Sequence, residues 1–181
     1  MRPDCFVSID VETSGPSPAR HALLSIGACL VDTPEAGFYA ELKPGDAECV
    51  PEAVAVSGLD LDRLEREGLA PPEAFQALVD WLAANIPPLA RPLFVGFNAC
   101  FDWMWVCDGF HQHLDHNPFG HAALDIKALY MGRAGVPWRE TGFTRVSERF
   151  GFGDDLPHHA LEDARLQARL VQSILALPPP T

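Results

Sequence analysis

The sequence predicts an α/β protein in which helices flank a β-sheet, and two observations lead to this expectation. Strand-like segments come first, at residues 4–12, 23–32 and 38–44, where apolar residues alternate or form short runs. Strand-like and helix-like segments then alternate through the rest of the chain. This order is typical of a sheet covered by helices. We expect the first three strands to pair antiparallel.

Apolar periodicity and helix-start signals predict the later elements. A short helix is expected to begin at Pro51, because proline suits the first helical position, and residues 71–86 carry an apolar stripe that predicts a longer helix. Residues 93–97 (LFVGF) predict a short buried strand, and Asn98 is a suitable N-cap for the helix after it. Further helices are expected at residues 98–114, 125–133, 141–150 and 159–176.

Length and composition indicate one soluble domain. Of the 181 residues, 48% are hydrophobic and 21% are charged, an ordinary globular balance. We expect a single domain over residues 1–176 and a Pro-rich tail over residues 177–181 that cannot continue the last helix. No apolar run approaches the roughly 18 residues of a membrane span, and the N-terminus lacks the features of a signal peptide. The expected location is therefore the cytoplasm, with no membrane partner.

The cysteines and histidines do not predict a structural metal site. The five cysteines include no C-x-x-C pair, so neither a disulfide framework nor a zinc ribbon is expected. Cys29 and Cys100 lie in apolar stretches and are expected as small core residues. The His-rich loop over residues 111–121 superficially suggests a transition-metal site, but it has no thiolate at a suitable spacing. We expect its histidines to be solvated or hydrogen-bonded.

Net charge limits the kind of partner. The chain carries a net charge of −12, with 13 Lys and Arg residues and no basic run. Proteins that hold long duplexes usually present a basic face, so a long nucleic-acid footprint is not expected. A short footprint, in which metal ions supply the positive charge, remains open.

The stretch FVSIDVETSGP, residues 6–16, ends an apolar strand with two carboxylates, Asp10 and Glu12. Residues i and i+2 of a strand share a face, with Cα atoms about 7 Å apart. Both side chains therefore project together at the C-terminal end of the strand, where ligands of open α/β sheets usually bind. In isolation, such a pair is more often two solvated edge charges.

Two further acidic residues lie early in predicted helices. Asp102 stands among bulky aromatic residues, a costly setting for a charge without a partner. Asp163 follows His158 by five residues, and five helical steps turn a chain through about 140°. His158 can therefore approach Asp163 only from the connection before the last helix. The alternative is an ordinary capping or surface histidine.

Convergence of these acidic side chains would create a metal site. Two carboxylates about 5 Å apart repel each other by roughly 3 kcal/mol at an effective dielectric of 20, so protons or cations must lie nearby. Hard oxygen ligands suit Mg²⁺ or Mn²⁺, and two such ions would clamp a phosphoryl group. A nearby histidine would accept the proton of the attacking water.

Three ordered motifs together resemble those of the DEDD (DnaQ-like) 3'-5' exonuclease superfamily, specifically its DEDDh branch of RNase T, oligoribonuclease and polymerase proofreading subunits. SIDVETSGP resembles the motif D-x-E-T-[ST]-G, FNACFDW resembles N-x-x-F-D, and HHALEDA resembles H-x-A-L-x-D-A. The resemblance spans residues from about 5 to 170. It implies a ribonuclease H-like fold, with a mixed central sheet of three antiparallel strands followed by parallel strands. It also implies 3'→5' hydrolysis that releases nucleoside 5'-monophosphates.

The resemblance further implies roles for individual residues. Two divalent cations, Mg²⁺ or Mn²⁺, would be held by four carboxylates, those of Asp10, Glu12, Asp102 and Asp163, and His158 would be the general base. The terminal nucleotide would be contacted by Glu12, Thr13, Leu59, Asn98 and Phe101. For Leu59 core packing is an equally good explanation, and for Phe101 it is the better one.

The chain departs from the family pattern at two positions and contains one further candidate. Ser57 stands where members often carry a histidine, and Phe97 precedes Asn98 where some members carry one. Neither change touches an expected metal ligand. Asp125 is explained most simply as a helix N-cap, with support of the site as the alternative.

We therefore expect a metal-dependent 3'-5' exonuclease that acts on single-stranded or frayed 3' ends. RNA or short oligonucleotides are favoured over long DNA, because an acidic surface suits a substrate with few phosphate contacts. The alternatives are DNA 3'-end trimming or proofreading, a catalytically silent nucleic-acid-binding module of the same fold, and a metal phosphoesterase for free nucleotides. Dimers are common in the family, so a homodimer is a further expectation.

Overall fold

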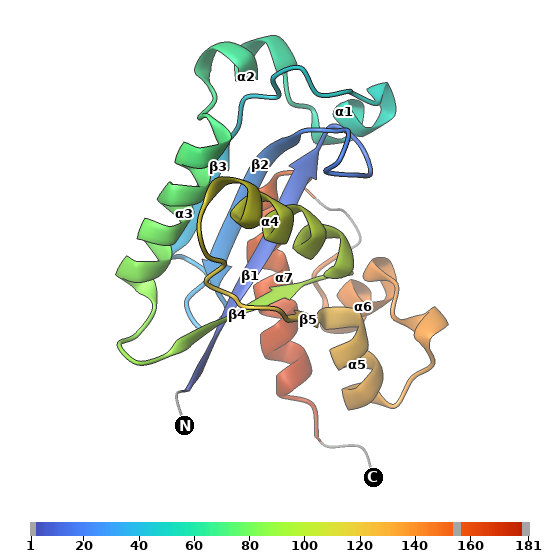
Figure 1. The fold of residues 1–181 in the computed structure, drawn as a ribbon. Helices are drawn as coiled ribbons and strands as arrows, with labels where there is room; N and C mark the ends of the chain where they lie inside the picture. Colours follow the sequence, from blue (N-terminus) through green and yellow to red (C-terminus); the bar gives the residue numbers. More distant parts are fainter. Residues whose placement is uncertain (1–2, 154–156, 179–181) are drawn as a thin grey trace.

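The central sheet has five strands in the order β3-β2-β1-β4-β5 (Figure 1) in the computed structural model, which describes residues 3–153 and 157–178. The strands are β1 (Asp4–Thr13), β2 (Leu23–Leu30), β3 (Gly37–Glu41), β4 (Arg91–Gly96) and β5 (Ala123–Asp125). β2 pairs antiparallel with both β1 and β3, whereas β4 pairs parallel with β1 and with β5. The expected α/β class and mixed sheet are confirmed.

Helices flank this sheet on both faces. Within the described residues they are α1 (Pro51–Ser57), α2 (Leu61–Glu67), α3 (Pro71–Asn85), α4 (Cys100–His113), α5 (Ile126–Ala134), the 3₁₀ helix η1 (Trp138–Glu140), α6 (Phe143–Phe150) and α7 (Ala160–Leu175). Figure 1 shows α4 in front of the sheet and α7 behind it. No helix in these two stretches combines the length and apolar character that crossing a bilayer requires.

Alternation along β1 separates two cores. One face of β1, covered by α3 and α4, carries the side chains of Val7, Ile9 and Val11. These side chains belong to a core that includes Phe75 and Phe110. On the opposite face, α7 packs against β1 and β2, and its apolar stripe forms a second core with residues of α5 and α6. The intervening residues of β1 therefore face α7. This geometry decides where the acidic residues of β1 point.

The start of α7 approaches the sheet at one glycine. Gly27 of β2 lies directly opposite Asp10 of β1. A Cβ atom on Gly27 would lie 2.1 Å from the main-chain carbon of Ala160, the first residue of α7. Only a residue without a side chain permits this contact, and glycine inside a strand often marks such a close approach. The absence of a side chain at Gly27 therefore brings the first turn of α7 next to the acidic end of β1.

Several local features differ from expectation. Asn98 is not an N-cap, because α4 begins at Cys100 after Ala99, and Asn98 instead adopts a left-handed conformation with φ 61°. Cys29 is buried as expected, but Cys100 is exposed. Helix α2, capped by a hydrogen bond from the N–H of Arg63 to the Asp60 carboxylate at 3.0 Å, was not expected. Strand β5 was not expected either, because its three residues are too few for a periodic signal.

Candidate active site

Three carboxylates from the two ends of the chain converge beside β1. Asp10 and Glu12 project from the face of β1 that α7 covers, and Asp163 lies in the first turn of α7. One carboxylate oxygen of each residue lies within 4.8 Å of the corresponding oxygens of the other two. The expected meeting of these three side chains is therefore present in the fold.

Asp102 lies beside this set of three rather than within it. Its side chain is 5% exposed, and its Oδ1 accepts a hydrogen bond from the main-chain N–H of Val11 at 3.2 Å. This bond holds the first turn of α4 against β1 at Val11, the residue that stands between Asp10 and Glu12 in the sequence. The contact also brings the Asp102 charge close enough to raise the pKa of Asp10.

The pKa values of all four carboxyl groups are raised. Burial raises the pKa of Asp10 well above its usual value, and the charges of Asp102, Asp163 and Glu12 raise it further. Burial also raises the pKa of Glu12 to about 7 and that of Asp102 to about 8, and it raises the pKa of Asp163. Burial and mutual repulsion both disfavour the charged forms. The four carboxyl groups therefore cannot all be ionised at neutral pH without added positive charge.

The polar contacts of Asp163 leave room for a cation. Its Oδ2 accepts a hydrogen bond from the main-chain N–H of His159 at 3.0 Å. Its Oδ1 is buried and has no hydrogen-bond partner among the described residues. A buried carboxylate oxygen without a donor, next to two further carboxylates, fits a hard divalent cation such as Mg²⁺ or Mn²⁺.

The two adjacent histidines have different surroundings. His158 lies in the connection directly before α7, as expected, with a left-handed φ of 51° that costs a non-glycine residue roughly 1–2 kcal/mol. It lines the cavity beside Asp10, Glu12 and Asp163, and its proximity offsets part of the rise that burial causes in the pKa of Asp163. The ring of His159 instead stacks on Tyr39 at a centroid distance of 4.3 Å. Of the two side chains, His158 is therefore the one that faces the pocket.

The pocket is a cavity of about 180 Å³ that combines acidic and aromatic walls. Its lining consists of Asp10, Val11, Glu12, Phe97, Phe143, His158, Asp163 and Gln167. Phe143 begins α6, and its ring meets that of Phe97 edge-on at a centroid distance of 5.3 Å. The sequence offered no signal for Phe143.

Gln167 is a site residue that sequence reasoning missed. It is 2% exposed, and its Nε2 donates a hydrogen bond to Asp10 Oδ1 at 2.6 Å. Its Oε1 accepts a hydrogen bond from the main-chain N–H of Phe97 at 2.9 Å. Gln167 follows Asp163 by four residues, so both share one face of α7. That spacing was the available signal.

Asp125 positions the helix that carries Asp102. Its Oδ1 accepts a hydrogen bond from the N–H of Ala128 at 2.7 Å, which confirms it as the N-cap of α5. Its Oδ2 accepts a second bond from the N–H of Ala99, also at 2.7 Å, at the start of α4. One side chain therefore links the starts of α4 and α5, and α4 is the helix that carries Asp102.

Four of the five expected substrate contacts lie outside the pocket lining. Thr13 is buried, and its hydroxyl donates to the carbonyl of Gly15 at 2.9 Å. Leu59 packs on a small cluster around Leu64, and Phe101 packs partly on the main core. Asn98 is exposed before α4. Glu12 alone among the five lines the pocket.

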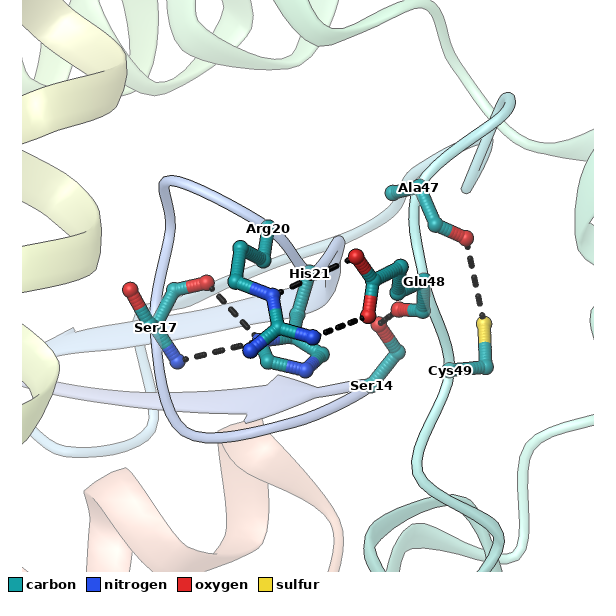
Figure 2. Close-up of polar contacts among 7 residues, drawn as sticks. All are labelled: Ser14, Ser17, Arg20, His21, Ala47, Glu48 and Cys49. Atoms are coloured by element: carbon teal, nitrogen blue, oxygen red, sulfur yellow. Dashed lines mark hydrogen bonds and ion pairs between the residues drawn. The ribbon is translucent and has the colours of Figure 1, made fainter.

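The loop after β1 is tied to the segment that leads into α1 (Figure 2). Ser14 Oγ donates a hydrogen bond to the carbonyl of Glu48 at 2.8 Å. The same oxygen accepts a hydrogen bond from the N–H of Ala22 at 2.7 Å. The Arg20 guanidinium contacts both carboxylate oxygens of Glu48, at 3.2 and 2.6 Å. The N–H of Val50, the residue before α1, donates to the carbonyl of Ser14 at 2.7 Å. These contacts hold the main chain next to Thr13.

Comparison with known proteins identifies relatives along nearly the whole chain. Residues 5–175 match the family described as the 3'-5' exoribonuclease Rv2179c-like domain. The 3'-5' DNA exonuclease Cap18 of Escherichia coli is 42% identical over 179 residues, which cover 96% of this chain and 94% of Cap18. Ribonuclease T of Escherichia coli strain K12 is 29% identical over 184 residues, which cover 93% of this chain and 83% of ribonuclease T.

Solved structures show the same fold at lower identity. The nuclease domain of 3'hExo, a DEDDh family member bound to rAMP, has a TM-score of 0.74 at 18% identity, covering 98% of this chain and 95% of that domain. Other similar structures are longer: this chain spans 64% of a 3'-exonuclease that recognises the histone mRNA stem-loop, with a TM-score of 0.79 at 17% identity. The expected ribonuclease H-like fold is confirmed.

Proposed function

The chain belongs to the 3'-5' exoribonuclease Rv2179c-like domain family, and from this premise we propose that its acidic pocket removes nucleotides from the 3' end of single-stranded nucleic acid. At the level of the family it is a 3'-5' exonuclease of the DEDDh type. The observation that carries the assignment of the site is the convergence of Asp10, Glu12 and Asp163, with their oxygens within 4.8 Å of one another.

Two divalent cations, Mg²⁺ or Mn²⁺, are the proposed cofactors. Their ligands would be Asp10, Glu12 and Asp163, together with Asp102, which lies beside these three residues. The raised pKa values of the four carboxyl groups and the unpartnered Oδ1 of Asp163 support this proposal. When bound, such cations lower the pKa of a water molecule and stabilise the negative charge on the leaving oxygen.

His158 is the proposed general base. Its side chain lines the pocket beside Asp163 and is exposed at the opening, so it can take a proton from water and return it to solvent. The water oxygen forms a bond to phosphorus, and the bond between phosphorus and the 3' oxygen of the preceding nucleotide breaks. That 3' oxygen gains a proton, and a nucleoside 5'-monophosphate leaves. Gln167 holds the Asp10 carboxylate in one orientation throughout.

RNA is the proposed substrate class, and DNA is a second candidate. The description of the matching family as exoribonuclease and the net charge of −12, which suits short substrates, favour RNA. The relative at 42% identity is named a DNA exonuclease, which favours DNA. Rates on ribo- and deoxyribo-oligomers of matched sequence distinguish the two.

The remaining assignments are proposals of the same kind. The main chain at Thr13, with Leu59, Asn98 and Phe101, would contact the terminal nucleotide beyond the pocket lining. Residues 1–176 would form one exonuclease domain followed by a tail at residues 177–181, of which residues 179–181 lie outside the described residues. The family match over residues 5–175 supports that boundary.

The test uses a 5'-labelled single-stranded oligomer with Mn²⁺. The expected products are a ladder shortened from the 3' end and nucleoside 5'-monophosphates, whereas an oligomer blocked at its 3'-hydroxyl stalls. Absence of mononucleotide product would favour a silent binding module, and hydrolysis of free nucleotides would favour a phosphoesterase.

Sedimentation of the same preparation tests the expected homodimer.

A further inference from the structure

The segment from α5 to α6 is basic in an otherwise acidic protein. We call residues 126–150 the basic lobe. Its charged side chains are the five cations Lys127, Arg133, Arg139, Arg145 and Arg149 and the two anions Glu140 and Glu148. The lobe therefore carries a net charge of +3 in a chain of net charge −12. Figure 1 shows α5 and α6 grouped at one edge of the molecule, beyond β5 and beside α7.

The cations of the basic lobe differ in their exposure and in the contacts that they make within the protein. Arg133 is used internally, because it donates to the main-chain carbonyls of Leu175 and Leu177 at the end of α7. Arg139 and Arg145 are exposed, and the carboxylate that pairs with Arg139 is 3.8 Å away. Arg139 and Arg145 are therefore two cations of the lobe that a ligand in solution can reach.

The basic lobe begins at the rim of the acidic pocket. Phe143, the first residue of α6, lines the pocket together with Asp10 and His158. Arg145 follows Phe143 within one helical turn, and Arg149 lies one further turn along α6. Positive side chains thus begin within one helical turn of the place where the 3' end would be held, on a face of α6 other than the one that carries Phe143.

An exposed aromatic ring accompanies these cations. Trp138 is 51% exposed and lies five residues before Phe143. The Nζ atom of Lys127 lies 4.4 Å from the centroid of its ring. Cations interleaved with exposed aromatic rings are typical of surfaces that bind single-stranded nucleic acid, because phosphates contact the cations and bases stack on the rings.

We propose that the basic lobe binds the phosphate backbone of the strand whose 3' end occupies the pocket, on the 5' side of the scissile bond, with Trp138 as a stacking surface for one base. This inference rests on the proposed function. The rest of the chain is acidic and repels the negatively charged strand, so the strand is directed along the basic lobe. Oligomers long enough to reach the lobe gain these contacts, and a dinucleotide does not.

The test compares two charge-reversal variants of the full chain. R139E/R145E alters the basic lobe, and R66E/R169E makes the same charge change at exposed arginines of α2 and of α7. Fluorescence anisotropy in EDTA measures the Kd for a 5'-labelled 12-nucleotide single strand, so that binding is read without hydrolysis. Rates on the 12-mer and on a dinucleotide are then measured with Mn²⁺.

We expect the lobe variant to weaken 12-mer binding at least fivefold more than the control variant and to leave the dinucleotide rate within twofold of wild type. Loss of two phosphate contacts should also make the slope of log Kd against log salt shallower by about 1.4. Equal Kd values for the two variants would overturn the proposal. A wild-type protein that binds the 12-mer through the lobe but hydrolyses nothing would refute the proposed function alone.

Discussion

Gln167 Nε2 lies 2.6 Å from Asp10 Oδ1, and the same amide group accepts a hydrogen bond from the N–H of Phe97. One side chain of α7 thus connects Asp10 of β1 to Phe97, the residue that follows β4. The contact orients the Asp10 carboxylate and lowers the pKa of that group, against the larger effect of burial. Gln167 is therefore a positioning residue of the proposed site.

Replacement of Gln167 by leucine should impair both stability and turnover. The substitution leaves the Phe97 N–H without an acceptor and Asp10 without a donor, which should cost about 1–3 kcal/mol of unfolding free energy. We expect kcat to fall at least tenfold, because Asp10 loses its fixed orientation. Gln172→Leu is the matched control, since Gln172 donates to the carbonyl of Val31 from the same helix, away from the pocket. Equal kcat values for the two variants would exclude a positioning role for Gln167.

Asp163→Asn should nearly abolish hydrolysis. The change removes a proposed cation ligand while leaving the side-chain shape, so we expect kcat to fall by roughly 100-fold or more, with a Tm close to that of wild type. Glu162→Gln is the control, because the neighbouring Glu162 is exposed and pairs with Arg165 at 2.6 Å. Measurement of kcat and of Mn²⁺ binding by calorimetry checks the prediction. Comparable rates for D163N and wild type would contradict the assignment.

The two histidines before α7 should differ in their effect on the pH profile. Loss of a general base typically costs 10²–10⁴ in rate, so His158→Ala should lower kcat by about 100-fold and flatten the acid side of the profile. His159→Ala removes a ring that stacks on Tyr39, and should leave the shape of the profile unchanged. A flattened profile in the His159 variant, with a normal one in the His158 variant, would reverse the assignment.

Without divalent cations, the protein should become less stable as pH rises. In the folded state burial raises the pKa of Glu12 to about 7 and that of Asp102 to about 8, whereas in the unfolded chain both pKa values are about 4. The folded state therefore binds protons more tightly, and the stability that these groups contribute is complete below about pH 4 and is lost as the pH rises to about 8.

Thermal unfolding in EDTA checks this expectation. We expect Tm at pH 8 to lie at least about 3 °C below Tm at pH 5.5, and Mn²⁺ at pH 8 to recover the difference. Asp102→Asn keeps an oxygen acceptor for the Val11 N–H but cannot ionise, so its Tm in EDTA should depend less on pH. A wild-type Tm in EDTA that rises between pH 5.5 and pH 8 would show that ionisation of the acidic cluster does not destabilise the folded protein.

Gly27→Ala should separate the two halves of the site. The added Cβ would lie 2.1 Å from the main chain of Ala160, so α7 must shift, at a cost of at least about 2 kcal/mol. We expect reduced stability and a loss of activity larger than the unfolded fraction explains. Gly132→Ala in α5 is the control: no atom lies within 4 Å of its added Cβ, and alanine should stabilise that helix by up to about 1 kcal/mol. Denaturant unfolding and kcat of the folded fraction test both variants.

Local patterns were sufficient for much of the fold and for the acidic residues of the site. Alternation in β1 predicted that Asp10 and Glu12 share a face, and they do. The apolar stripes of α3 and α7 predicted both helices to within a residue of their ends. The angle between helical positions required His158 to lie before the last helix if it was to approach Asp163, and it lies there. Each of these inferences uses neighbours within a few residues, where the repeat of the strand or helix decides which way a side chain points.

Long-range packing decided the rest. The three residues of β5 form a strand only because β4 supplies a parallel partner, and Gly27 matters only because α7 crosses β2 at that point. Gln167 and Phe143 join the pocket from helices whose local patterns are those of core packing. A sequence determines which side chains share the face of one element, whereas the partner of that face depends on how distant elements pack to bury apolar surface. The acidic set could therefore be named from the sequence, whereas the contacts through which Gln167 and Asp125 position it exist only in the folded chain.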